Sequence, residues 1–177
     1  MKASDQGGLD LSAKSADELG LLVGQSTGLD VQIAQHPNVN GATLAGLAAS
    51  PSRVVKRAVM LNPLCPTSVL MDLASKFPLE LFNNPVLPLL LLEEPDLFSR
   101  LPISTVKAIL KSPDCPEMMI SWALKHGGSS HALALADRAQ IPIKALKQIA
   151  QGPHIKAAER AQSRLMGMGI ALGKDER

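Results

Sequence analysis

Aromatic residues are almost missing from this sequence, which has no Tyr, one Trp and three Phe in 177 residues. Hydrophobic residues still make up 46% of the chain, so its core must consist of Leu, Ala, Val, Ile and Met. Small aliphatic side chains of this kind suit closely packed helices. Thirteen Pro and thirteen Gly, spread along the chain, interrupt long elements. The composition therefore predicts many short helices rather than a few long ones.

A charge excess and a long apolar run are also missing. Lys and Arg (18) exceed Asp and Glu (16) by only two, which is too little for the strongly basic surface of a dedicated nucleic-acid-binding protein. The longest apolar stretch, residues 86–92, falls far short of the roughly 20 residues that cross a bilayer. We therefore expect no membrane association.

Cysteine is scarce as well, with only Cys65 and Cys115 in the chain. The N-terminus lacks the basic segment followed by an apolar segment that marks a secretory signal. These two features predict a cytoplasmic protein with free thiols.

The sequence repeats itself. Segment 61–74 recurs fifty residues later as segment 111–124, and related copies begin near Gln35, Asn84 and Arg138. One residue of each copy serves as a reference position, which we call the pivot. The pivots are 22 to 28 residues apart: Asn40, Pro66, Pro88, Pro116 and Pro142.

Hydrophobic residues recur at fixed distances from the pivots, with the spacing of one helix face. Four residues after the pivots stand Leu44, Leu70, Leu92, Ile120 and Leu146. Seven residues after them stand Leu47, Leu73, Pro95, Ala123 and Ile149. Six and seven residues before them stand Ile33–Ala34, Val59–Met60, Leu81–Phe82, Ile109–Leu110 and Leu135–Ala136. The pattern predicts one helix before and one helix after each pivot, with a short second helix at Pro95.

Proline marks the borders of these helices. The four pivot prolines are expected at the first position of a second helix, where no backbone N–H is needed. The prolines three residues earlier end the first helix, because they deny helical angles to the residue before them. His36 fills the place held by Asn62 and Asn84 in other copies, and we interpret all three as residues that cap the turn.

The two ends of the chain are expected to differ from the repeats. Ser15 and Glu18 have capping-box spacing, which predicts a helix over about 16–24, and a C-terminal helix is expected over about 153–166. Residues 126–130 are expected to form a loop. We predict a disordered segment 1–12, a single helical-repeat domain 13–166 and a flexible tail 167–177.

The motif NPxxPxxxLxxLA, preceded by an apolar helix, resembles the leucine-rich repeat variant family over residues 31–160. The resemblance implies α and 3₁₀ helices alternating in a right-handed superhelix. Some members also hold an iron–sulfur cluster on an N-terminal Cys-rich segment, but residues 1–30 contain no Cys, so the cluster does not carry over. The expected fold is an all-α solenoid of about five degenerate two-helix repeats.

No catalytic, metal or cofactor site is predicted, and we expect a protein that is not an enzyme. Cys65 and Cys115 share a repeat position that holds Leu87 or Ile141 in other copies, which indicates buried structural thiols. His126 and His131 could join Cys115 around a metal, but no fourth ligand lies nearby. A catalytic site formed between repeats stays an alternative.

Basic residues form clusters that would serve a nucleic-acid-associated module, which is our alternative function. Their members are Arg53, Lys56 and Arg57, then Lys107 and Lys111, then Lys156, Arg160 and Arg164. Almost no aromatic side chains are available for base stacking. The alternative is therefore the weaker one.

Trp122 stands six residues after its pivot, where the other copies have Gly46, Asp72, Glu94 and Gln148. A position that is polar in other copies is expected to be exposed, so Trp122 would form a protein-interaction face with Met118, Leu90 and Met71. The alternative is that Trp122 packs locally on the 126–130 loop. The leading hypothesis is a non-enzymatic scaffold for a protein or peptide partner, with the oligomeric state left open.

Overall fold

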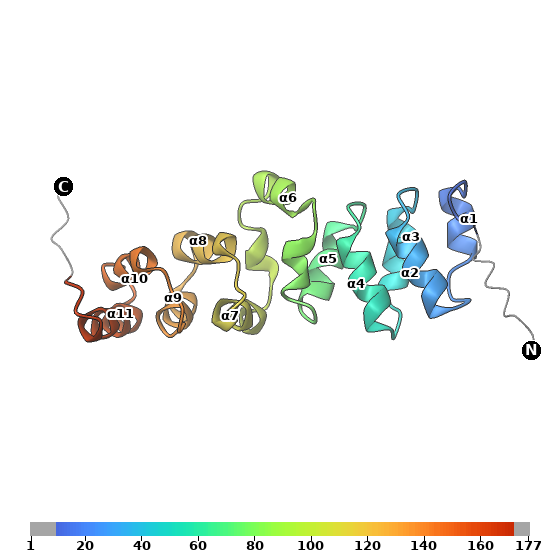
Figure 1. The fold of residues 1–177 in the computed structure, drawn as a ribbon. Coiled ribbons are helices and arrows are strands. Elements are labelled where there is room, and N and C mark those ends of the chain that lie inside the picture. Colours follow the sequence, from blue (N-terminus) through green and yellow to red (C-terminus); the bar gives the residue numbers. More distant parts are fainter. Residues whose placement is uncertain (1–9, 172–177) are drawn as a thin grey trace, which may run out of the picture. The chain divides into compact units, whose positions relative to one another are not determined.

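A computed structural model describes residues 10–171, which contain eleven α-helices, two 3₁₀ helices and no strand (Figure 1). The expected all-α class is confirmed for this part of the chain. Its residues form two compact units, one ending at Leu89 and the other beginning at Leu90. We describe each unit by itself and call them the N-terminal and the C-terminal unit.

The N-terminal unit consists of two rows of helices. Its helices are α1 (Ala16–Leu21), α2 (Thr27–Gln35), α3 (Gly41–Ala48), α4 (Arg53–Leu61), α5 (Thr67–Ala74) and the 3₁₀ helix η1 (Glu80–Asn83). Successive contacts join α2, α4 and η1 into a first row and α1, α3 and α5 into a second row. Helix α6 (Leu87–Glu93) includes the point where the units divide.

The C-terminal unit has the same two-row arrangement (Figure 1). Its helices are the 3₁₀ helix η2 (Leu97–Arg100), α7 (Ile103–Lys111), α8 (Glu117–His126), α9 (Ser129–Ala136), α10 (Ile143–Ala150) and α11 (Ile155–Gly167). The first row contains α7, α9 and α11, and the second row contains α8 and α10. Each pivot except Pro88, which lies inside α6, stands between a first-row helix and the second-row helix that follows it.

The predicted hydrophobic positions form the core of each unit. Nearly all of them are buried, and they include Ile33, Leu44, Leu47, Val59, Leu70, Leu73, Ile109, Ile120, Leu135, Leu146 and Ile149. Burying one such side chain contributes about 1.5–3 kcal/mol. Phe82 is half-buried, and the exposed exceptions are Pro95 and Leu92, which is 78% exposed. The reason is register: α6 begins at Leu87, before its pivot Pro88, whereas α3, α5, α8 and α10 begin directly after theirs.

Three of the four pivot prolines lie one position earlier than predicted, whereas Pro88 is the second residue of α6. Pro66, Pro116 and Pro142 are N-cap residues, with extended ψ of 138°, 146° and 134°. Their carbonyl oxygens accept the first helical hydrogen bonds, for example from the N–H of Leu70 at 2.9 Å. The fixed φ of proline is therefore compatible with the start of a helix, but the extended ψ places each of these prolines at the N-cap, one residue before the first helical residue.

Both ends of the described chain are more ordered than expected. The capping box of Ser15 and Glu18 is present, although α1 ends at Leu21, and Leu11 is buried. Helix α11 ends in a Schellman motif, in which the Ile170 N–H donates to the Leu165 oxygen at 2.9 Å and Gly169 has a φ of 69°. The predicted disorder at 1–9 and the predicted tail at 172–177 lie outside the described residues.

Two further expectations need correction. The loop predicted over 126–130 is only Gly127–Gly128, because α8 runs to His126 and α9 begins at Ser129. The helices on both sides of each pivot from Asn40 to Pro142 are α-helices except around Pro88, and 3₁₀ helices occur only as η1 and η2 among the described residues. A regular alternation of α and 3₁₀ helices is therefore not seen.

Asparagine side chains connect successive repeats in the N-terminal unit. The Asn62 Nδ2 donates to the oxygens of Ala34 (2.8 Å) and His36 (3.3 Å), at the C-terminal end of α2. The Asn84 Nδ2 donates to the oxygens of Met60 (2.6 Å) and Asn62 (3.3 Å), at the end of α4. Each asparagine thus caps the first-row helix of the preceding repeat.

Arginine side chains make the equivalent connection in the C-terminal unit. Arg138 donates to the carbonyl oxygens of Leu110, Ser112 and Pro113 at the end of α7. Arg164 donates to those of Ala136, Arg138 and Ala139 at the end of α9. We call Asn62, Asn84, Arg138 and Arg164 the bridging residues. The first three stand four residues before a pivot, and Arg164 follows Arg138 by 26 residues, so α11 is the first half of a further repeat.

No helix in residues 10–171 has the length and apolar character needed to traverse a lipid bilayer.

Candidate functional site

Trp122 does not project from the surface, and the prediction of an exposed indole was wrong. Its side chain is only 8% exposed. The ring makes an edge contact with Phe98 at a centroid distance of 5.5 Å, stacks on His126 at 6.3 Å and meets the edge of His131 at 5.9 Å. The two histidines lie on either side of Gly127–Gly128, so the alternative of local packing at this turn agrees with the structure.

The other members of the predicted interaction face are placed differently from one another. Met71 is buried at 7% exposure, Leu90 is half-buried, and Met118 is 40% exposed. Met71 belongs to the N-terminal unit and the others belong to the C-terminal unit. Met118 is therefore the only one of the four with an exposed side chain, and this set does not supply a docking surface.

A groove between α8 and α10 is one of the concave surfaces of the C-terminal unit. Two cavities of about 260 Å³ and 210 Å³ share Leu124, Lys125 and Gln148 in their walls, so they adjoin along the groove. The first cavity is also lined by Glu117, Ile120, Ser121, Pro142, Lys144 and Ala145. The second continues past Ile149 to Gly152 and His154. We call this surface the α8–α10 groove.

The floor of the α8–α10 groove is aliphatic and its rims are polar. Ile120 and Ala145 are buried and Leu124 is half-buried, whereas Ser121 and Gln148 are exposed. Short side chains, Ser121 on α8 and Ala145 on α10, line the first cavity from its two helices. The arrangement offers apolar contact at the bottom and hydrogen-bonding groups at the edges.

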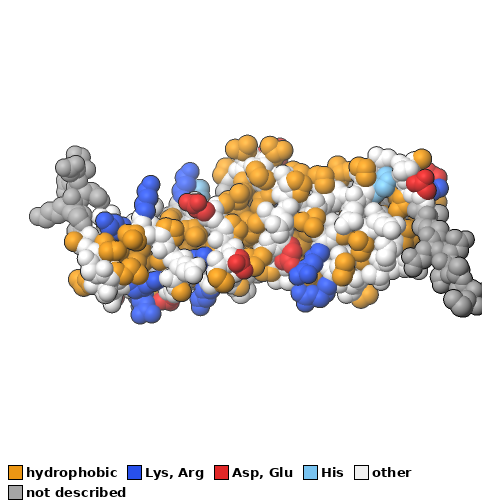
Figure 2. Space-filling view, viewed as in Figure 1, with side chains coloured by type: hydrophobic (Ala, Val, Ile, Leu, Met, Phe, Trp, Pro, Cys, Tyr) orange, Lys and Arg blue, Asp and Glu red, His pale blue; other side chains and the backbone are white. Residues whose placement is uncertain are grey.

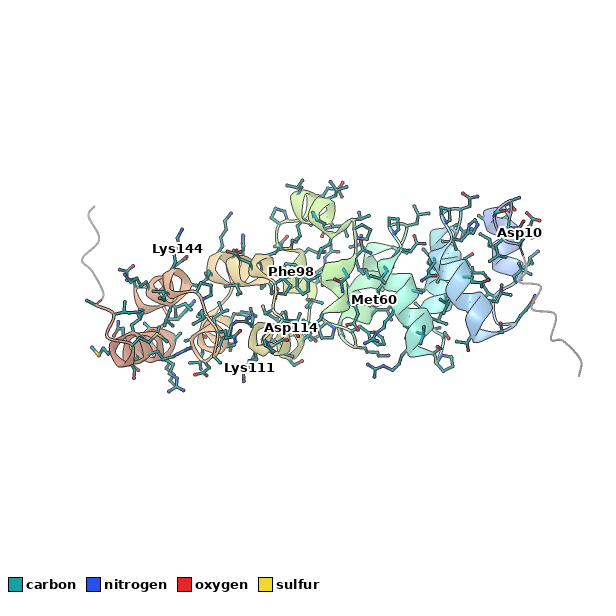
Figure 3. All side chains as sticks on the ribbon, viewed as in Figure 1. Asp10, Met60, Phe98, Lys111, Asp114 and Lys144 are labelled. Carbon is teal, nitrogen blue, oxygen red and sulfur yellow. The ribbon has the colours of Figure 1, made fainter. Side chains whose placement is uncertain are left out.

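Two lysines give the groove a basic character. Lys125 and Lys144 are exposed, and neither forms an ion pair within residues 10–171. Figure 3 shows Lys144 pointing away from α10, and in Figure 2 basic side chains rise from both α8 and α10. One carboxylate, Glu117 in the first turn of α8, also lines the first cavity. No sequence pattern indicated this groove, because its residues are ordinary core and surface positions of the repeat.

The arginines of the basic clusters predicted from the sequence contact other groups of the protein. Arg57 contacts Glu80 at 2.7 Å through both Nε and Nη2, and Arg53 lies over the Phe77 ring at 5.0 Å. Arg160 pairs with the Asp137 carboxylate at 2.8 Å.

The other members of these clusters differ in the exposure of their side chains and in their contacts within the protein. Arg164 is a bridging residue, Lys56 is half-buried and Lys156 is exposed. A phosphate backbone would therefore meet arginines that already contact other groups, and the unpaired cations among the described residues of these clusters would be Lys56, Lys107, Lys111 and Lys156.

Both cysteines are buried free thiols, as predicted. Burial raises the pKa of Cys65 to about 11 and also raises the pKa of Cys115, which Arg138 lowers to a smaller extent. Raised pKa values keep both thiols protonated near neutral pH, which disfavours nucleophilic or metal-binding roles. No group of three or more His, Cys, Asp or Glu side chains within residues 10–171 is arranged to hold a metal ion.

The chain matches no family model, no curated protein and no solved structure.

Proposed function

We propose that this protein is a non-catalytic helical-repeat scaffold that binds a segment of a partner protein in the α8–α10 groove. The observation that carries the proposal is the pair of adjoining cavities with an aliphatic floor and unpaired lysines on the rims. Stacked helical repeats offer extended surfaces of this kind without buried polar chemistry. The free thiols fit a reducing compartment such as the cytoplasm.

An α-solenoid architecture is part of this proposal. The two-row arrangement inside each unit and the bridging residues at repeat spacing support it. The resemblance to leucine-rich repeat variant proteins supports a right-handed superhelix, although the α-helices on both sides of most pivots depart from that family's alternation.

The size of the cavities favours a protein segment over a small molecule. Small-molecule sites usually have volumes of about 300–1,000 Å³ and enclose most of their ligand. Each cavity of the groove is smaller than that and open along one side of the helix pair. Cavities of this size suit individual side chains of a longer chain.

Selection from a random peptide library on the full chain tests the proposal. Enriched peptides should bind the wild-type protein and lose binding to Ser121→Phe, which fills the first cavity from an exposed position. Ser163→Phe is the matched control, because Ser163 is an exposed residue of α11 outside the groove. If no enriched peptide is sensitive to Ser121→Phe, the groove is not a binding site.

A further inference from the structure

We infer that the occupant of the α8–α10 groove is an extended peptide segment that alternates small aliphatic and acidic side chains. This inference rests on the proposed function and names the partner's chemistry. Three features of the groove lead to it: the pairing of the cavities, the length of the bordering helices and the charge of the rims.

The paired cavities match the side-chain spacing of an extended chain. Helix α8 has ten residues and is therefore about 15 Å long, which corresponds to about five residues of extended backbone. In such a segment, alternate side chains point to the same face. Two side chains separated by one residue can then enter the two adjoining cavities, which share Leu124, Lys125 and Gln148.

The floor selects small aliphatic side chains at these two positions. Ile120, Leu124, Ala145 and Ile149 supply most of the apolar wall, and no Phe, Tyr or Trp lines either cavity. Val side chains fit within cavities of about 260 Å³ and 210 Å³ and bury apolar surface against these walls. The polar rim residues Ser121 and Gln148 can hydrogen-bond the segment's backbone.

The rims select carboxylates at the intervening positions. Side chains between the two buried ones point sideways and outwards, towards Lys125 on α8 and Lys144 on α10, which have no internal ion-pair partner among the described residues. Glu117 would repel a carboxylate of the bound segment only near the first turn of α8. Two lysines against one glutamate leave the groove with a net positive charge.

Nucleic acid is disfavoured as the occupant. Phosphates could pair with the two lysines, but single-stranded bases bind mainly by stacking on aromatic side chains. The cavities have no Phe, Tyr or Trp, and their one ring is the imidazole of His154. A segment of protein uses both the aliphatic floor and the basic rims.

Fluorescence anisotropy with matched peptides tests the inference on the full chain. The probe is a terminally blocked peptide of alternating Asp and Val, and its reference is the same peptide with Asn for Asp. The Asp peptide should bind about fivefold more tightly, because two exposed ion pairs contribute about 0.5 kcal/mol each. Lys125→Gln combined with Lys144→Gln should remove this preference. Lys76→Gln combined with Lys156→Gln makes the same charge change at exposed positions outside the groove and should keep it.

The possible results separate this inference from the proposed function. Equal binding of the Asp and Asn peptides, with both lost in Ser121→Phe, would overturn the acidic preference and leave the groove as a peptide site. An Asp preference that survives loss of both groove lysines would also overturn it. Tighter binding of a single-stranded oligothymidylate than of the Asp peptide would replace the peptide with nucleic acid.

Discussion

The two units cap their first-row helices with different side chains. In the N-terminal unit, Asn62 and Asn84 each use one Nδ2 group for two carbonyl oxygens of the preceding helix end. Their Oδ1 atoms accept from the N–H groups of Leu64 and Val86, so each asparagine also holds its own turn. A short amide therefore serves two helix ends at once.

In the C-terminal unit, the buried guanidinium of Arg138 caps the preceding first-row helix. Arg138 is only 6% exposed, and it donates to three carbonyl oxygens of the α7 end and, through Nε, to the Gln140 oxygen at 2.6 Å. A buried charge is costly unless its donors are satisfied, and the negative end of the α7 dipole compensates the charge. The repeat therefore specifies a structural role, the capping of the previous helix, and not a residue type.

The largest expected difference between the units concerns the position six residues after the pivot. Trp122 is buried there in the C-terminal unit, whereas Asp72 is exposed in the N-terminal unit. Trp122→Ala should lower the free energy of unfolding by about 4 kcal/mol, because it leaves a large cavity beside Phe98. Asp72→Ala should change it by less than about 0.5 kcal/mol. Urea denaturation measures both, and equal small effects would show that Trp122 is not part of the core.

Removal of the arginine bridge is the next largest effect. Arg138→Met should lower the free energy of unfolding by about 3 kcal/mol, because it leaves buried carbonyl oxygens without donors. Arg138→Lys should recover only part of this loss, since an ammonium group cannot reproduce the planar fork. Arg100→Met is the control, because Arg100 makes only an exposed ion pair with Glu94 and should cost at most about 0.5 kcal/mol. Equal losses for Arg138→Met and Arg100→Met would contradict a bridging role.

The asparagine bridge is expected to contribute less. Asn84→Ala should lower the free energy of unfolding by about 2 kcal/mol, since fewer carbonyl oxygens lose a donor than at Arg138. Its neighbour Asn83 is exposed, so Asn83→Ala provides a matched control with little effect. An Asn84→Ala protein as stable as the wild type in urea would contradict an equivalent capping role of asparagine and arginine in the two units.

The smallest expected effect is a pH dependence at the start of α9. The Gly128 N–H donates to the His131 Nδ1 at 3.0 Å, which requires a neutral imidazole. Burial, and to a lesser extent Lys107, lowers the pKa of His131 below its ordinary value of 6.5. The stabilisation is therefore complete above pH 6.5 and is lost as the pH falls through the lower pKa of the folded protein.

The expected loss at His131 is about 0.5 kcal/mol, at the low end for a helix cap because the ring is only partly buried. Thermal unfolding at a series of pH values measures it. His131→Gln keeps an acceptor at the same helix position and should flatten this part of the pH profile. An unchanged profile in His131→Gln would assign the pH dependence to other groups.

The sequence predicted the helices and most of the core, because aliphatic spacing and proline act locally. It failed at Leu92, where α6 starts before its pivot, and at Trp122, where burial depends on Phe98 of η2, His131 of α9 and His126 at the end of α8. The roles of Asn62 and Asn84 as turn residues were recognised, but their reach to the preceding helix was not. Arg138 and Arg164 were missed because arginine and asparagine differ in size and charge. They share only the carbonyl oxygens of the preceding helix end, to which both donate.

The α8–α10 groove was also beyond sequence reasoning. A groove depends on the sizes of the side chains that line it from two helices, here Ser121 and Ala145. The repeat pattern specifies which positions are exposed, and says nothing of which exposed positions leave a hollow between them.

Native-state labelling of the two cysteines tests the bridging role most directly. Cys65 and Cys115 are buried at the same repeat position, one in each unit, and react with a thiol reagent only when the surrounding repeat opens. Mass spectrometry resolves the two labelling rates. Arg138→Met should raise the rate at Cys115 by about a hundredfold, equivalent to about 3 kcal/mol, and Asn62→Ala should raise the rate at Cys65. An unchanged rate at Cys115 in Arg138→Met would contradict the account.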